Sequence, residues 1–458
     1  MNTQTSSHKE LYTALVAGVI FPLQERLKQH NTVALRKQME QSQWWTRDQL
    51  RDLQLSRLKQ LLTHAQQHVP YYRDLFAQLG LQAEQVSSLQ DLSRFPFLIK
   101  AEIRAHTEAL KSEKARHLAR FNTGGSSGEP LIFFIGKERV SHDVAAKWRA
   151  TRWWDVDIGD REIVVWGSPI ELGTQDSVRG LRDKVFRTKL LPAFEMSEQK
   201  LDDFLAQIRQ LRPKMLFGYP SALSHFARHA AKRGLVMNDL GIQVAFVTSE
   251  RLYDEQREQI ASTFGCAVAN GYGGRDAGFI AHQCPHGSMH ITAEDIIVEI
   301  VDTHGLPVPV GESGEIVVTH LATSEFPFIR YRTGDIGVLS DAACSCGRGL
   351  PVLQEIQGRS TDFLVAHNGT VMHGLALIYI LRDLPQVRAF KIIQESLDLT
   401  RVLVVLEEPL SAELSSQIIL GFRARLGAAV EIQVEQVNEI PAEKSGKFRY
   451  VISKVAAY

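Results

Sequence analysis

The feature that most constrains the fold is an alternation of short apolar runs and longer amphipathic stretches between residues 161 and 270. Strands separated by helices imply an α/β fold, in which a parallel sheet carries helices on both faces. The expected strands are Arg161–Gly167, Lys214–Gly218, Gln243–Thr248 and Cys266–Asn270, and the expected helices are Phe194–Leu211, Ser221–Arg233 and a third that ends at Ser262. Ligands of such sheets bind beyond the carboxyl ends of the strands. The candidate binding segments are therefore those that follow the strands: Gly218–Ser221, Thr248–Glu250 and Gly271–Asp276.

The chain is too long for a single compact domain. One hydrophobic core rarely serves more than about 250–300 residues, and this chain has 458. Apolar residues at helical spacing predict a helical region over residues 1–118, and the α/β core follows over about 119–290. Turn-forming glycines between β-rich runs predict an antiparallel or barrel-like subdomain over about 291–358. Residues 359–458 predict a small α+β domain attached to the larger domain 1–358.

Charge and hydropathy exclude several classes of partner. Lys+Arg and Asp+Glu are both 52, and this balance argues against nucleic acid and against a polybasic membrane anchor. The apolar run Leu11–Leu23 is too short to span a bilayer and lacks a small-residue cleavage site. It predicts an amphipathic helix that is either buried or faces a partner. We expect a cytoplasmic protein without a membrane span, and a homodimer is compatible with this class.

A glycine-rich loop stands between two apolar flanks, at Phe121–Pro130. Its glycines leave the main chain open to close approach, and successive backbone N–H groups in such a turn form a concavity that binds anions. A polyphosphate fits best, although the loop is not a Walker motif because no Gly-Lys-Ser/Thr closes it. Taken alone, a Gly/Ser run of this kind favours a solvent-exposed turn between two strands. The residues that would contact phosphate are Thr123, Gly124, Gly125, Ser126, Ser127 and Gly128.

Further motifs, taken together with this loop, carry a family resemblance. They are Asn270–Asp276, Tyr331–Asp335, Gly358–Asp362 and Ser445–Arg449, with Leu58–Tyr72 and Cys344–Arg348 as supporting segments. In order and spacing the chain resembles the adenylate-forming (acyl-CoA synthetase) superfamily, and more narrowly its phenylacetate–CoA ligase and CapK-like branch. The resemblance covers nearly the whole chain.

The resemblance implies a reaction in two steps. A carboxylic acid attacks ATP to give an acyl-adenylate and pyrophosphate, after which the C-terminal domain rotates as a mobile lid. The acyl group then passes to a thiol, in most relatives that of coenzyme A. The alternative acceptor is an amine, as in a CapK-like amide-forming ligase of polysaccharide or secondary-metabolite biosynthesis. An alternative of another class is a catalytically weak nucleotide-binding relative, which Glu129, Asp276 and Thr361 motivate because the family usually has other residues there.

The resemblance also implies roles for individual residues. Lys447 would stabilise the leaving pyrophosphate, and Asp276 would be a catalytic carboxylate that holds Mg²⁺. Tyr272 would stack on adenine, and Asp335 would accept hydrogen bonds from the ribose hydroxyls. For Glu250, a carboxylate at a helix N-terminus is an equal alternative. The other residues expected to contact ATP are Ser249, Glu250, Asn270, Gly271, Gly273 and Arg359, and those expected near the acyl group are Trp166, Tyr219, Thr248 and Ala269.

A second group of residues has the composition of a zinc site. Three thiolates and an imidazole are a common structural zinc set, and Cys284, His290, Cys344 and Cys346 could supply it. His282 and His286 compete with His290 as the imidazole. The alternative is that the cysteines are small buried apolar residues, which is the expectation for Cys266.

Overall fold

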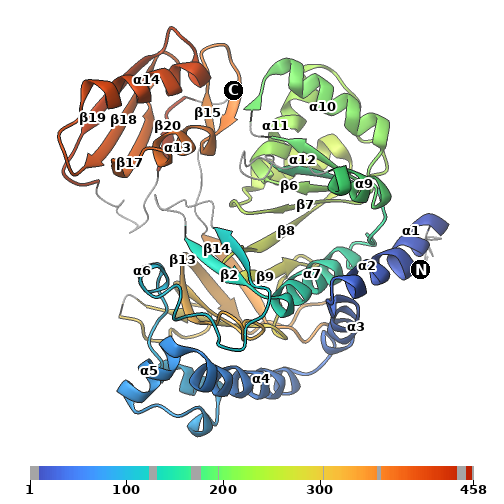
Figure 1. Ribbon diagram of the computed structural model, residues 1–458. Helices are drawn as coiled ribbons and strands as arrows, with labels where there is room; N and C mark the ends of the chain where they lie inside the picture. Colours follow the sequence, from blue (N-terminus) through green and yellow to red (C-terminus); the bar gives the residue numbers. More distant parts are fainter. Residues whose placement is uncertain are drawn as a thin grey trace.

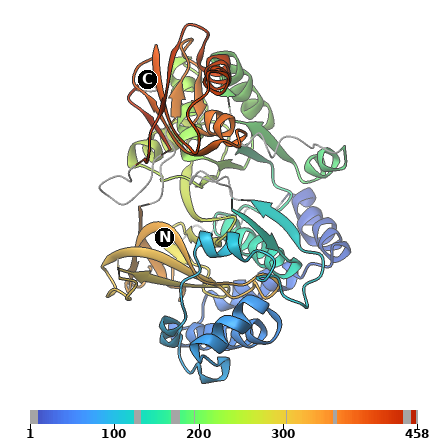
Figure 2. The ribbon, with the colours of Figure 1, turned by 60° about the vertical axis from the view of Figure 1, so that its left-hand side comes forward.

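The computed structural model describes residues 10–122, 131–166, 177–193, 195–302, 304–357, 363–440 and 450–455. Figure 1 shows three regions: N-terminal helices, a large sheet with its covering helices, and a C-terminal domain that stands apart at the top left. Seen from the side, the C-terminal domain lies over the α/β half of the molecule (Figure 2).

The predicted parallel sheet is confirmed. Its strands are β4 (Thr188–Pro192), β3 (Glu162–Trp166), β6 (Met215–Gly218), β7 (Val244–Thr248) and β8 (Ala267–Gly274), in this spatial order. All four neighbouring pairs are parallel. Edge strand β4 and the preceding helix α9 (Ser177–Val185) were not predicted. The sequence signal for β4 is weak because this strand ends in a proline, a residue that occurs in sheets mainly on edge strands.

Helices cover both faces of this sheet, as the alternation predicts. On one face α10 (Glu198–Leu211), α11 (Pro220–Lys232) and α12 (Asp254–Phe264) bury their apolar sides against Val165, Leu216 and Val247. On the other face α7 (Lys137–Arg152) packs over a cluster that contains Phe217 and Phe246. In the described part of the chain these strands are therefore covered on both faces, which leaves the strand ends for ligands.

The β-rich half is antiparallel, as expected, but it joins the same sheet. Strand β8 pairs with β7 in parallel and with β9 (Gly278–Gln283) in antiparallel fashion. Beyond β9 the order is β10, β14, β13, β12 and β11, so that the described strands form one sheet of 11. The bounds are β10 Met289–Ile291, β11 Ile296–Val301, β12 Ser313–His320, β13 Phe328–Ser340 and β14 Val352–Gln357.

The N-terminal region is helical, as predicted. It consists of α1 (Leu11–Leu15), the π-helical turn η1 (Val16–Ile20), α2 (Phe21–Leu27), α3 (Thr32–Ser42), α4 (Arg47–His68), α5 (Pro70–Leu79), the 3₁₀ turns η2 (Ala83–Gln85) and η3 (Leu89–Arg94), and α6 (Lys100–Ala105). A capping box of Thr46 and Gln49 begins α4. Pro70 ends α4 and begins α5, because proline suits the first turn of a helix. Leu58 and Leu62 of α4 join the core of the antiparallel half.

The predicted small α+β domain is present at the C-terminus. Its sheet has the order β19 (Glu431–Gln436), β18 (Leu399–Leu406), β17 (Val387–Gln394) and β20 (Val451–Ser453), and α13 (Leu375–Arg382) and α14 (Ala412–Leu426) pack on it. A hairpin of β15 (Phe363–Val365) and β16 (Val371–His373) precedes α13. Strand β16 also pairs with β5 (Glu195–Met196) of the α/β half.

Near the site, β1 (Ala119–Asn122) and β2 (Ile132–Ile135) form an antiparallel pair on either side of the glycine-rich segment. Among the residues that the structure describes, no helix combines the length and the apolar character needed to cross a lipid bilayer.

Candidate nucleotide and acyl site

The predicted acyl-site residues gather at one edge of the sheet. Trp166 ends β3, Tyr219 follows β6 and Thr248 ends β7. The rings of Trp166 and Tyr219 stack, with centroids 4.5 Å apart and planes inclined by 23°. Thr248 aligns with Gly271 of β8. The carboxyl ends of neighbouring parallel strands thus meet at one place, which is where α/β sheets bind their ligands.

Ala269 lies deeper than the other three. It is fully buried in the cluster that includes Ala150 of α7, Phe217 and Phe246. Side chains alternate along a strand, so Ala269 points to the opposite face from Asn270 and Tyr272 of the same strand. Its contact with a substrate stays a prediction.

The segment after β7 has an unusual backbone. Ser249 has φ = 73°, in the left-handed region that residues with a side chain rarely adopt. The next residue, Glu250, accepts a hydrogen bond from the hydroxyl of Ser221 in the first turn of α11. This contact ties the exit of β7 to the start of α11. The Glu250 carboxylate therefore lies at the N-terminus of a helix, which is the alternative given above for this residue. Its contact with adenine stays a prediction.

Two of the predicted nucleotide residues contact each other across the sheet. The Tyr272 hydroxyl of β8 donates to Asp335 Oδ2 of β13 at 3.0 Å. The Asp335 backbone N–H donates to Thr333 Oγ1 at 3.1 Å, which orients the end of this motif. Burial, together with the negative charge of Asp335, raises the pKa of Tyr272 well above its usual value. The phenol therefore stays protonated and acts as a hydrogen-bond donor.

Asp276 is held in a similar way. Its Oδ2 accepts from the Tyr331 hydroxyl at 2.5 Å, and its Oδ1 accepts from the Ala277 N–H at 3.1 Å. The turn needs glycine nearby, because a β-carbon on Gly273 would come within 2.3 Å of the Gly278 carbonyl oxygen. Tyr331 belongs to the motif Tyr331–Asp335, but no role was predicted for it from the sequence. Only the pairing of distant segments reveals it as the partner of Asp276.

Asn122, near the start of the glycine-rich loop, lies beside this turn. Arg275 Nη1 donates to the Asn122 carbonyl oxygen at 3.5 Å. The start of the loop is therefore near Asp276. The predicted residues that lie outside the described ranges are Thr123, Gly124, Gly125, Ser126, Ser127, Gly128, Glu129, Arg359, Thr361 and Lys447.

The predicted metal ligands come together. The donor atoms of Cys284, His290, Cys344 and Cys346 all lie within 4.8 Å of one another. Cys284 Sγ is 3.7 Å from Cys344 Sγ, and Cys346 Sγ is 3.2 Å from His290 Nε2. Tetrahedral zinc with Zn–S bonds of about 2.3 Å separates its ligands by roughly 3.7 Å. The donor set and its spacing therefore fit zinc, while His286 instead contacts the Ser345 hydroxyl at 3.0 Å.

The surroundings of the cluster orient the imidazole. His290 Nδ1 faces the Leu350 carbonyl oxygen at 3.3 Å, which leaves Nε2 directed at the thiols. Burial lowers the pKa of His290 to about 4, so the ring is neutral. Burial raises the pKa of Cys284 to about 11, so this thiol ionises at neutral pH only if a cation offsets the charge.

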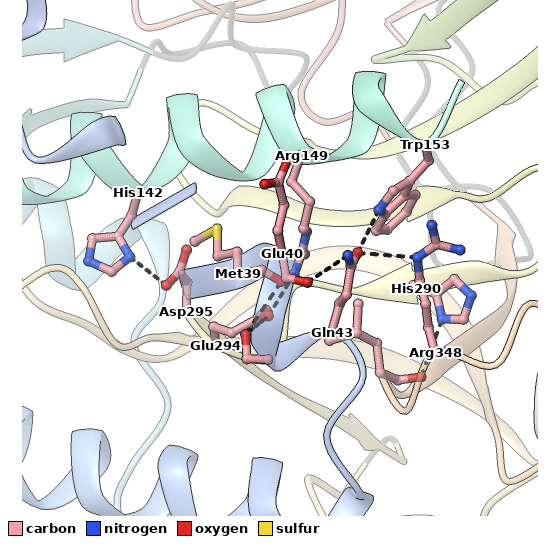
Figure 3. Close-up of polar contacts among 12 residues, drawn as sticks. Met39, Glu40, Gln43, His142, Arg149, Trp153, His290, Glu294, Asp295 and Arg348 are labelled. Atoms are coloured by element: carbon pink, nitrogen blue, oxygen red, sulfur yellow. Dashed lines mark hydrogen bonds and ion pairs between the residues drawn. The ribbon is translucent and has the colours of Figure 1, made fainter. Parts of the chain in front are cut away.

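The N-terminal helices reach this cluster through Gln43, as Figure 3 shows. Gln43 Oε1 accepts from Trp153 Nε1 at 2.7 Å and from Arg348 Nε at 3.2 Å. The ring of Trp153 also contacts His290 edge-on, with centroids 5.8 Å apart. The cluster thus lies where α7, the segment after α3 and the antiparallel half meet.

Comparison with known proteins identifies two regions. Residues 190–324 match the AMP-binding enzyme model, and residues 364–454 match the CapK C-terminal domain. Phenylacetate-coenzyme A ligase of Thermus thermophilus is 25% identical over 89% of this chain and 97% of its own length. Protein CapK of Staphylococcus aureus is 21% identical over 88% and 89%.

A solved structure shares the fold over most of the chain. 2-Hydroxyisobutyryl-CoA ligase, in complex with 2-HIB-AMP and CoA in the thioesterification state, aligns with a TM-score of 0.64 at 22% identity, covering 89% of this chain and 90% of its own. The same ligase in its postadenylation state aligns with a TM-score of 0.59. The chain thus contains an AMP-binding enzyme region and a CapK C-terminal domain, and its relatives include phenylacetate-coenzyme A ligases and protein CapK.

Proposed function

We propose that this protein is an ATP-dependent ligase that activates a small carboxylic acid as its acyl-adenylate and transfers the acyl group to the thiol of coenzyme A. The observation that carries the proposal is the meeting of Tyr272, Asp335, Asp276 and Tyr331 at the sheet edge, beside the start of the glycine-rich loop. The relatives named as coenzyme A ligases support the same activity. The location proposed for this reaction is the cytoplasm, where ATP and coenzyme A would be its co-substrates.

Asp335 would bind the ribose. A carboxylate offers about four lone-pair sites, so it can accept from two ribose hydroxyls while it holds the Tyr272 hydroxyl. That hydroxyl fixes the tyrosine ring, whose face would support adenine next to Ser249 and Glu250. Trp166, Tyr219 and Thr248 would line the acyl group at the neighbouring strand ends.

Asp276 would hold Mg²⁺ through its carboxylate, and the ion would neutralise charge on the phosphates. Tyr331 fixes the carboxylate through Oδ2. The loop Thr123–Gly128 would bind the terminal phosphates through amides and hydroxyls, Arg359 would reach the ribose or a phosphate, and Lys447 would stabilise the charge that develops on the leaving pyrophosphate. These last roles rest on the sequence motifs.

Pyrophosphate exchange with a panel of carboxylic acids tests the adenylation step. We expect exchange with at least one acid, and we expect Asp335→Ala to reduce kcat/KM for ATP by roughly 10–100-fold, because hydrogen bonds to a charged group contribute about 1.5–3 kcal/mol. Tyr272→Phe is the matched control, since it keeps the ring and loses only the hydroxyl contact. Lys447→Ala should abolish exchange yet still use added acyl-adenylate. ATP binding without exchange for any acid would favour a nucleotide-binding relative instead.

A second acceptor has support from the C-terminal domain, which matches the CapK model. An amine on a sugar or an amino acid would then replace coenzyme A. Mass spectrometry of products formed from the active acid, with coenzyme A in one reaction and amines in the other, separates the two. A thioester without an amide supports the coenzyme A ligase, and the reverse supports the amide ligase.

We also propose that Cys284, His290, Cys344 and Cys346 hold a structural zinc ion, which would supply charge to ionise the thiols and connect three segments of the fold. Cys346→Ser should lose bound zinc and lower Tm by at least roughly 2–4 °C, the shift that accompanies about 1 kcal/mol in a large domain. Cys266→Ser is the control, because Cys266 lies outside the cluster. Elemental analysis and thermal unfolding are the measurements. Purified wild-type protein that is folded but contains no zinc would contradict the site.

A further inference from the structure

The first helical segment carries an apolar stripe that faces solvent. The five side chains are spaced by four residues, and their exposed fractions are 90% for Leu11, 49% for Leu15, 48% for Val19, 56% for Leu23 and 85% for Leu27. Figure 1 shows α1 and α2 at the outer right-hand edge of the molecule, away from the C-terminal domain. Contiguous exposed apolar surface of this kind marks an interaction site.

The opposite side of the same helix is firmly attached. Thr13 Oγ1 donates to Asp160 Oδ1 at 2.7 Å, and the ring of Phe21 contacts that of Trp148 with centroids 5.1 Å apart. Glu25 is buried and accepts from Thr32 Oγ1 at 2.5 Å. The helix is therefore held in place, and the stripe is presented by a fixed element.

The π-helical turn η1 reduces the drift of the stripe around the helix axis. In a regular α-helix, residues four apart are rotated by about 40°, so that five such residues would drift by roughly 160° around the axis. A π-helical turn takes one extra residue, and η1 lies in the middle of the stripe, at Val16–Ile20. The buried residues Val16 and Phe21 are accordingly five apart instead of four. The extra residue offsets about 100° of this drift, and all five apolar side chains are exposed.

The stripe is symmetric about its central residue. Leu15 and Leu23 lie at equal distances from Val19, and so do Leu11 and Leu27. At the ends, Glu10, which pairs with Arg187 in its own chain, is matched by Lys28, which pairs with Glu25. An antiparallel partner with the same sequence would thus place leucine on leucine, valine on valine, and an acidic residue beside a basic one. A two-fold axis requires this self-complementary pattern.

We propose that α1, η1 and α2 pair with the same segment of a second copy of this chain, antiparallel, about a two-fold axis near Val19. Gly18 lies beside the stripe, and a β-carbon there would meet nothing within 4 Å, so the two helices have room to approach. A membrane surface is the weaker occupant. Interfacial helices carry a basic polar face, whereas here the face opposite the stripe is packed on the protein. The contact is short compared with standard interfaces of about 1,200–2,000 Å², so the dimer depends on concentration.

Analytical ultracentrifugation of the full chain tests the pairing. The wild type should shift from monomer to dimer across roughly a hundredfold range of concentration. Val19→Glu should remain monomeric through that range, because it places two carboxylates against each other at the axis. Its fold should be unchanged by circular dichroism. Leu420→Glu, at a residue 68% exposed on α14 of the C-terminal domain, is the matched control and should dimerise like the wild type.

Cysteine cross-linking tests the geometry. Val19→Cys should form a disulfide-linked dimer, and Leu11→Cys should cross-link with Leu27→Cys when the two variants are mixed but not with itself. Wild-type protein that is monomeric at the highest concentration would overturn the proposal, as would self-cross-linking of Leu11→Cys. Binding to anionic vesicles that Val19→Glu abolishes, in a monomeric wild type, would assign the stripe to a membrane surface instead.

Discussion

Replacing Arg149 with Met is expected to lower the free energy of unfolding by about 3–5 kcal/mol, because the change leaves a buried carboxylate without its counter-ion. The Arg149 side chain is fully buried, and its Nη1 is 2.6 Å from Glu294 Oε1. Ser42 Oγ donates to the same oxygen at 2.6 Å. As Figure 3 shows, Arg149 extends from α7 towards Met39 of α3 and Glu294, so the pair connects three parts of the N-terminal domain.

Chemical denaturation followed by tryptophan fluorescence measures this loss, since Trp153 lies against Arg149 with the guanidinium carbon 5.4 Å from the ring centre. The double variant Arg149→Met/Glu294→Leu should recover most of the stability, because apolar replacements of a whole buried pair are often neutral or stabilising. Arg182→Met removes a half-exposed ion pair with Asp183 and should change stability by only about 0–1 kcal/mol. An Arg149→Met variant as stable as this control would refute the assignment.

Cross-linking β5 to β16 is expected to slow adenylation strongly while sparing thioester formation, because the proposed function requires the C-terminal domain to rotate between the two steps. Val371 aligns with Met196 in this antiparallel pair, and both are buried. Aligned Cα atoms lie about 4.5–5.5 Å apart, within the range of about 4.4–6.8 Å that a disulfide requires. The double variant Met196→Cys/Val371→Cys should therefore form a disulfide that holds the C-terminal domain in the arrangement seen in the structure. Of the two states of 2-hydroxyisobutyryl-CoA ligase compared above, the thioesterification state aligns with the higher TM-score.

In the oxidised double variant, the rate of pyrophosphate exchange should fall by roughly 10²–10³-fold. A loss of this size follows the removal of one group that stabilises developing charge, which is the role proposed for Lys447. It should still convert added acyl-adenylate and coenzyme A to the thioester, and reduction should restore exchange. Each single cysteine variant is a control for the substitutions themselves. Full exchange in the oxidised protein would show that this arrangement already supports adenylation. Absence of both reactions in the reduced and single variants would instead count against the proposed function.

The local features of the fold were readable from the sequence. The apolar runs that became β3, β6, β7 and β8 were predicted because strand and helix periodicity is a property of neighbouring residues. The end of α4 at Val69 and Pro70 followed from the geometry of proline. The cluster of Cys284, His290, Cys344 and Cys346 was predicted by ligand type alone, and its four donor atoms do lie together.

What the sequence by itself determined is therefore where most helices and strands of the α/β core lie, though not β4 or α9, and which residues have the chemistry for a nucleotide or a metal. Only the tertiary structure decided that β8 joins a parallel and an antiparallel half, that Tyr331 holds Asp276, and that Arg149 meets Glu294. The last contact joins residues 145 positions apart. Local periodicity carries no information about such a pairing, because it depends on how whole elements pack and on which charges must be neutralised once water is excluded.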